Sequence, residues 1–148
     1  MDRRADERSA SFQKLPRPLR LKRQRLIRPL FDRSRDDVGT LGRGSIRLLY
    51  RIVPREVTGV DVPVQVGFAP GRLTSNVRRN RIKRVLREVY RTHQDALVKS
   101  FGERPDTLTL MVLYRGPDEG AEARIRGDLP RALDALVERL RQEWDETE

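Results

Sequence analysis

Residues 78–91 hold the densest group of chemically active side chains, because seven of these fourteen residues are Arg or Lys. Apolar residues recur among them at helical spacing and form one stripe: Ile82, Val85, Leu86, Val89 and Tyr90. At ~100° per residue, the opposite side of such a helix carries Asn80, Lys83, Arg84, Arg87 and Arg91. Arg81 falls at the edge of the stripe, and Arg78 and Arg79 fall on its side in the first turn. The pattern predicts an amphipathic helix over about residues 76–97, with one basic face.

These cations repel one another along the predicted helix. Like-charged i,i+4 pairs such as Arg79–Lys83 each cost ~0.2–0.5 kcal/mol, and Glu88 is the only acidic residue between Asp61 and Asp95. A solvated charged face is the simpler interpretation of a charge run. However, a face with so little internal neutralisation favours an anionic ligand, and guanidinium groups bind phosphate through paired hydrogen bonds. We therefore expect this helix to bind the phosphate backbone of a nucleic acid.

No pattern typical of a protein active site accompanies the basic helix, and no catalytic residue is predicted. The single histidine, His93, falls near the helix end without a nucleophile pattern beside it. The acidic pairs Asp36-Asp37 and Asp118-Glu119 fall in loop-like sequence and are interpreted as solubilising charge, so a protein-borne metal site stays unknown.

Length, composition and charge agree with a small nucleic-acid-binding protein. The chain has 148 residues and no cysteine, which excludes disulfide and cysteine-metal scaffolds. Its net charge of +10 divides into +15 over residues 1–94 and −5 over residues 95–148, which points to a polyanionic partner for the first part. We find neither a membrane-spanning apolar run nor a secretory signal, and we therefore expect a cytoplasmic protein without a membrane partner.

The coarse pattern predicts an α+β fold, a small α/β sandwich of order α-β-β-(β)-α-β-α. A short or kinked helix is expected in residues 19–35 because of Pro29, and a loop at Gly39, Gly42 and Gly44. Strands are expected at residues 45–53, 62–69 and 107–114, the last one central. Asp128 is expected to cap the last helix. Residues 1–18 are expected to be disordered, residues 19–142 to form the domain, and residues 143–148 to be an acidic tail.

The motif Arg79-Asn80-Arg81-Ile-Lys83-Arg84-x-x-Arg87-Glu88-x-x-Arg91 resembles the signature of the bacterial ribonuclease P protein component. The resemblance continues, in order, over about residues 19–142. It includes Arg20-Leu21-Lys22-Arg23 with Leu30-Phe31, Leu48-Leu49-Tyr50, Val66-Gly67, and Val112-Leu113-Tyr114-Arg115-Gly116-Pro117.

This resemblance implies a protein subunit that binds the catalytic RNA of ribonuclease P and the 5′ leader of precursor tRNA. The RNA would carry the catalysis, with Mg²⁺ bound mainly through it. The residues that would face the catalytic RNA or the metal-rich region near the cleavage site are Arg79, Asn80, Arg81, Lys83, Arg84, Arg87 and Arg91. Arg78, beside them in the first turn, is predicted to bind RNA as well. The family's leader cleft lies between its first helix and the sheet, and its positions correspond here to Phe31, Tyr50, Ile27 and Arg72. Phe31 and Tyr50 would stack on unpaired bases, whereas Ile27 stands where the family has an aromatic residue. In the segment after the second predicted strand, the family has Ser-Lys-Lys and this chain has Pro70-Gly71-Arg72, so Arg72 alone keeps a basic group there. The resemblance also implies a left-handed β-α-β crossover around the basic helix, against the common hand.

Three other classes of protein share some of these features. A ribosomal-type RNA-binding protein would bind RNA without affecting tRNA processing. A protein nuclease acting alone needs a carboxylate–metal cluster, which the sequence does not show. A helix-turn-helix DNA-binding protein needs a helix where this sequence has a strand and the Pro70-Gly71 turn, so no DNA partner is expected.

Overall fold

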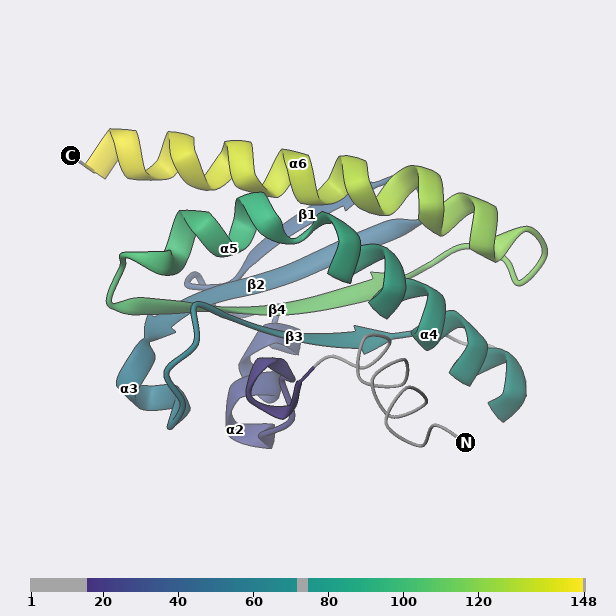
Figure 1. Ribbon diagram of the computed structural model, residues 1–148, viewed down its shortest axis with the longest axis horizontal. Coiled ribbons are helices and arrows are strands. Elements are labelled where there is room, and N and C mark those ends of the chain that lie inside the picture. The colour runs from purple at the N-terminus through teal and green to yellow at the C-terminus, as the bar shows by residue number, and fades with distance from the viewer. Residues whose placement is uncertain (1–15, 72–74, 148) are drawn as a thin grey trace, which may run out of the picture.

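The computed structural model describes residues 16–71 and 75–147, which form three layers with a β-sheet as the middle layer (Figure 1). One face of the sheet is covered by the long helices α4 (Asn76–His93), α5 (Asp95–Gly102) and α6 (Ala121–Thr147). The other face carries the short helix α2 (Gln24–Ile27) and the 3-10 helix η2 (Arg28–Phe31). The predicted α/β sandwich is therefore confirmed.

The sheet has four strands in the order β1-β2-β4-β3. Their bounds are β1 (Gly39–Arg43), β2 (Ile46–Pro54), β3 (Val64–Ala69) and β4 (Asp106–Tyr114). β2 is antiparallel to both β1 and β4, whereas β3 is parallel to β4. As predicted, the apolar strand of residues 107–114 (β4) lies inside the sheet. The chain passes from β3 to its neighbour β4 through α4 and α5. Two smaller helices, η1 (Arg17–Leu19) and α3 (Arg55–Thr58), precede α2 and follow β2.

The loop expected at Gly39, Gly42 and Gly44 is wrong for the first two glycines, because residues 39–43 form strand β1, and it is confirmed at Gly44. Gly39 pairs directly with Tyr50 on β2, and a Cβ atom at Gly39 would come within 2.1 Å of the Tyr50 ring carbon Cζ. Gly44 has a φ of 55° in the turn between the two strands, which favours glycine. The glycines therefore make room for a ring and a turn, and they do not interrupt the strand.

Two apolar clusters lie on opposite faces of the sheet because side chains alternate along each strand. The larger cluster, between the sheet and α4, α5 and α6, includes Leu48, Tyr50 and Leu110. The smaller cluster lies between the sheet and α2 with η2, and its buried members are Leu21, Leu26, Leu30, Leu49 and Met111. Neighbours along β2 thus point to different layers.

Pro29 has the effect expected of it, because α2 gives way to the 3-10 helix η2 at this point. The predicted helix 76–97 is wrong at its end, since α4 stops at His93 and α5 begins after Gln94.

Asp128 does not cap α6, which begins at Ala121 and contains Pro130. Ala121, Ile125 and Leu129 are all buried at i, i+4 and i+8, so packing extends the helix across the proline. α6 also continues to Thr147, through most of the segment expected to be an acidic tail. No helix in the described ranges is long and apolar enough to cross a membrane.

Candidate nucleic-acid interface

Helix α4 is anchored to the core by the predicted apolar stripe, all five residues of which are buried. The Ser75 side chain caps the helix by accepting a hydrogen bond of 3.2 Å from the backbone N–H of Arg78. Since the stripe fixes the rotation of the helix, it also fixes where the basic residues point.

The eight residues predicted to contact RNA all lie on this one helix. Six have exposed side chains: Arg78, Arg79, Asn80, Arg81, Lys83 and Arg84. Arg87 and Arg91 are partly buried, and the Nε of Arg91 is buried without a hydrogen-bond partner within the described residues. The structure therefore assembles the predicted basic face.

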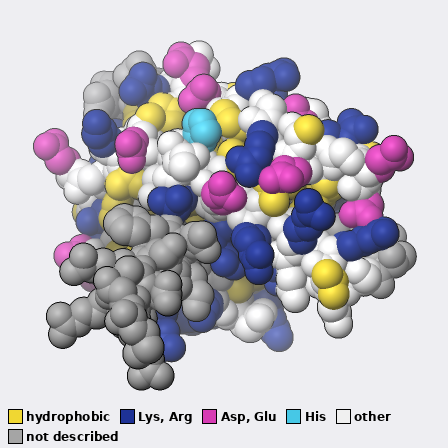
Figure 2. Space-filling model, turned by 45° about the vertical axis from the view of Figure 1, so that its right-hand side comes forward, with side chains coloured by type: hydrophobic (Ala, Val, Ile, Leu, Met, Phe, Trp, Pro, Cys, Tyr) yellow, Lys and Arg dark blue, Asp and Glu magenta, His cyan; other side chains and the backbone are white. Residues whose placement is uncertain are grey.

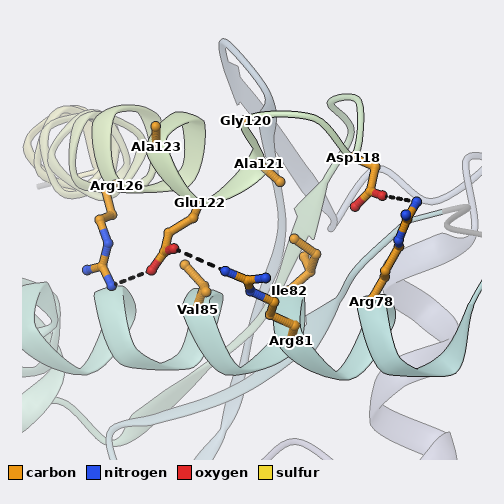
Figure 3. Close-up of a pocket in the computed structure, with 10 residues that line it drawn as sticks. All are labelled: Arg78, Arg81, Ile82, Val85, Asp118, Gly120, Ala121, Glu122, Ala123 and Arg126. Atoms are coloured by element: carbon orange, nitrogen blue, oxygen red, sulfur yellow. Dashed lines mark hydrogen bonds and ion pairs between the residues drawn. The ribbon is translucent and has the colours of Figure 1, made fainter.

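Among the described residues, the cations of α4 that form ion pairs lie on the side that faces α6 (Figure 3). Arg78 pairs with Asp118, and Arg81 lies 3.8 Å from a carboxylate oxygen of Glu122. Glu122 also accepts a hydrogen bond of 3.0 Å from Arg126. Figure 2 shows basic and acidic side chains interleaved on one face of the molecule.

The other side of the helix carries cations that have no acidic partner in the part of the chain that the structure describes. In residues 16–71 and 75–147, no ion pair is found for Arg79, Lys83, Arg84 or Arg87. Burial lowers the pKa of Arg87, and the nearby charges of Arg20 and Arg84 lower it further. We call Arg79, Lys83, Arg84 and Arg87 the open basic face, a concentration of positive charge suited to phosphate groups.

A groove opens on the opposite face of the sheet, between η2 and the strands. Phe31 lies there with 50% of its surface exposed. Ile27 is partly buried and packs against the smaller apolar cluster behind it. The cations that line this groove are Arg33, Arg35, Arg47 and Arg115. Aromatic and basic side chains therefore meet where the family resemblance implies a leader cleft.

The structure does not place Tyr50 in this groove. Tyr50 is only 5% exposed and belongs to the cluster under α4, α5 and α6, because it alternates with Leu49 along β2. Leu49 and Arg47 line the groove instead. Arg72 lies outside the described residues.

Sequence reasoning missed the groove cations Arg33, Arg47 and Arg115. A signal existed for Arg47, since Arg47, Leu49 and Arg51 alternate with core residues and so share one face of β2. Arg33 and Arg115 follow the ends of η2 and β4, and no sequence period links them to the groove.

The remaining titratable candidates have structural roles. The ring Nδ1 of His93 lies 2.9 Å from the carbonyl oxygen of Val89, within the last turn of α4. Asp37 binds Arg35 and Arg51, and these guanidinium groups hold its pKa far below the ordinary value. Asp37 and Asp118 are thus ion-paired residues whose side chains stay partly exposed, at 43% and 34%. No group of three His, Asp or Glu side chains suited to a metal ion occurs in the described residues.

Two comparisons with known proteins bear on this arrangement. A family model described as Ribonuclease P matches residues 15–140. The solved structure of the Staphylococcus aureus RNase P protein superposes with a TM-score of 0.55 at 16% sequence identity, covering 80% of this chain and 94% of that chain. At this identity the likeness supports the fold alone. No curated protein matches the sequence.

Proposed function

The chain belongs to the ribonuclease P protein family as a protein subunit of that enzyme, and we propose that it acts by binding RNA through α4. The observation that carries the proposal is the open basic face, where four cations share one side of a helix without acidic partners in the described residues. Such a face gains free energy by releasing the counterions condensed on RNA phosphates. The catalytic RNA of ribonuclease P is the proposed partner.

The groove beside η2 is the proposed site of the 5′ leader of precursor tRNA. An unpaired base can stack on Phe31, and Arg33, Arg47 and Arg115 can bind the flanking phosphates. The groove and α4 lie on different faces of the sheet. One surface is therefore available for the catalytic RNA while the other is available for the substrate.

In this proposal the RNA partner carries out the cleavage. Mg²⁺ would bind mainly through RNA phosphate oxygens, which this hard cation prefers together with water. The basic residues would lower the charge repulsion between the two RNAs, so that less Mg²⁺ is needed to bring them together. We place this activity in the cytoplasm, where precursor tRNA is processed in bacteria.

The test is 5′-leader cleavage of a precursor tRNA by the cognate RNA at low Mg²⁺, with and without the protein. We expect the unaltered protein to restore cleavage. The double variant Arg79→Ala with Arg84→Ala should fail to do so, because it removes half of the open basic face. The matched control, Arg131→Ala with Arg141→Ala, removes two exposed arginines from α6 and should restore cleavage fully.

Two results would contradict the proposal. Equal loss in the control would mean that net charge alone matters. A protein that binds the RNA but never changes cleavage would favour the ribosomal-type alternative.

A further inference from the structure

We propose that Asp118 and Glu122 form an acidic border along α4 that determines which nucleic acids the helix accepts. The inference rests on the proposed binding of RNA by α4 and adds specificity to it. In this view the phosphate backbone is confined to the open basic face. Polyanions that would also contact the side facing α6 are disfavoured.

The border is built from two different elements. Asp118 lies in the loop before α6, 34% exposed at its side chain, and forms an ion pair with Arg78. Glu122 lies in the first turn of α6. Both carboxylates line the hollow between α4 and α6, together with Arg78, Arg81 and Arg126 (Figure 3).

Glu122 has a second ion-pair partner besides Arg81. Its carboxylate lies 3.0 Å from Arg126, a shorter contact than the 3.8 Å to Arg81. Arg126 in turn lies 3.5 Å from Glu88 of α4, which ties the two helices together. If Arg81 turned toward a ligand, Glu122 would still have Arg126 as a partner.

A phosphate group approaching from the α6 side meets these carboxylates before it can pair with Arg78 or Arg81. It must displace an existing ion pair and approach a like charge, whereas on the open basic face no carboxylate among the described residues competes with it. In a regular duplex both strands present phosphates. A bound duplex would therefore contact both the open basic face and the side of α4 that faces α6. An RNA shaped to contact the open basic face alone avoids the border.

The probe is a short B-form DNA duplex, a polyanion unrelated to the proposed partner. Asp118→Asn with Glu122→Gln should bind it roughly tenfold more tightly, since two freed arginines can add two phosphate contacts. The slope of log affinity against log salt should steepen by up to about 1.8, because each added contact contributes about 0.9. Affinity for ribonuclease P RNA should rise less, so that discrimination between the two falls.

A matched control separates the border from net charge. Glu119→Gln with Glu138→Gln changes the charge equally at exposed carboxylates without ion pairs among the described residues, and it should leave duplex binding nearly unchanged. Circular dichroism checks the folding of each variant. The single variants Asp118→Asn and Glu122→Gln provide the same test if the double variant is unstable.

An equal rise in the control, or no rise in the border variant, would overturn the inference. The duplex measurement requires no ribonuclease P RNA. Failure of the proposed function would appear separately, as absence of binding to that RNA by the unaltered protein.

Discussion

Phe31 presents an aromatic ring to solvent at the groove beside η2, with half of its surface exposed. Stacking on a base contributes about 1–3 kcal/mol, so Phe31→Ala should weaken holoenzyme binding of precursor tRNA by about fivefold to 150-fold. Mature tRNA lacks the leader and should bind as before. Equilibrium binding of both RNAs to the reconstituted enzyme measures the difference.

Tyr50→Phe is the control for this prediction. It keeps a ring that lies on the other face of the sheet, and it should leave leader binding unchanged. Weaker leader binding by Tyr50→Phe together with full binding by Phe31→Ala would show that the groove has been assigned to the wrong face.

Asp128, in the N-terminal third of α6, joins this helix to the turn between β1 and β2. Its carboxylate accepts hydrogen bonds from the backbone N–H and the hydroxyl of Ser45, at 2.8 and 2.7 Å. These bonds lower the pKa of Asp128 below its ordinary value of 3.8. Because the folded pKa is lower than the unfolded one, the stabilisation is present above the unfolded value and is lost as pH falls through the folded value.

Asp128→Asn should therefore lower the free energy of unfolding at pH 7 by about 1 kcal/mol, the usual size for one hydrogen-bonded group. The difference from the unaltered protein should shrink as the pH falls below 3.8. Urea unfolding at neutral and acid pH measures it. A constant difference at every pH would mean that shape, and not the charge of Asp128, holds the turn.

At the scale of elements, helices and strands whose apolar residues repeat at a regular spacing could be predicted from the sequence. Elements and boundaries that depend on a contact with a residue far away in the chain could not. The stripe of α4 and the apolar run of β4 carry their own periodicity, and both were predicted. β1 was missed because its Gly39 is explained only by the Tyr50 ring on the next strand. The start of α6 was missed because Pro130 and Asp128 imitate a helix N-terminus, and the role of Asp128 depends on Ser45.

Two glycines test whether a glycine position depends on the local backbone or on packing against a residue far away in the sequence. Gly127 lies inside α6 with open space around its Cβ position and no positive φ. Gly127→Ala should therefore raise the free energy of unfolding by about 0.5–1 kcal/mol. Gly39→Ala should lower it, because the new methyl group would overlap the Tyr50 ring. Denaturant titration of both variants gives the two signs, and stabilisation by Gly39→Ala would contradict the packing of Tyr50 on β1.

Across the whole molecule, opposite charges are brought together from distant parts of the sequence. The surplus of positive charge in residues 1–94 and of negative charge in residues 95–148 is visible in the sequence. The pairing of Asp118 with Arg78 is not, because it depends on how α6 packs beside α4. Among the described residues, Asp118 and Glu122 pair with Arg78 and Arg81 but not with the open basic face. We therefore expect the cations of this face to repel one another and to destabilise the free protein at low ionic strength.

Sulfate should therefore stabilise the free protein, which we expect to be partly unfolded at low ionic strength, more than chloride does at equal ionic strength. A tenfold excess of sulfate over its dissociation constant adds about 1.4 kcal/mol to the free energy of unfolding, or roughly 3–6 °C to the melting temperature.

The variant Arg84→Gln with Arg87→Gln should melt at a higher temperature at low salt, because charge repulsion is relieved, and its melting temperature should respond less to sulfate. Sulfate also stabilises proteins through its exclusion from their surfaces, and this part should persist in every variant. The control Arg131→Gln with Arg141→Gln should keep the full response. Circular dichroism melting curves that sulfate leaves unchanged, or an equal loss of response in the control, would mean that anions do not bind the open basic face.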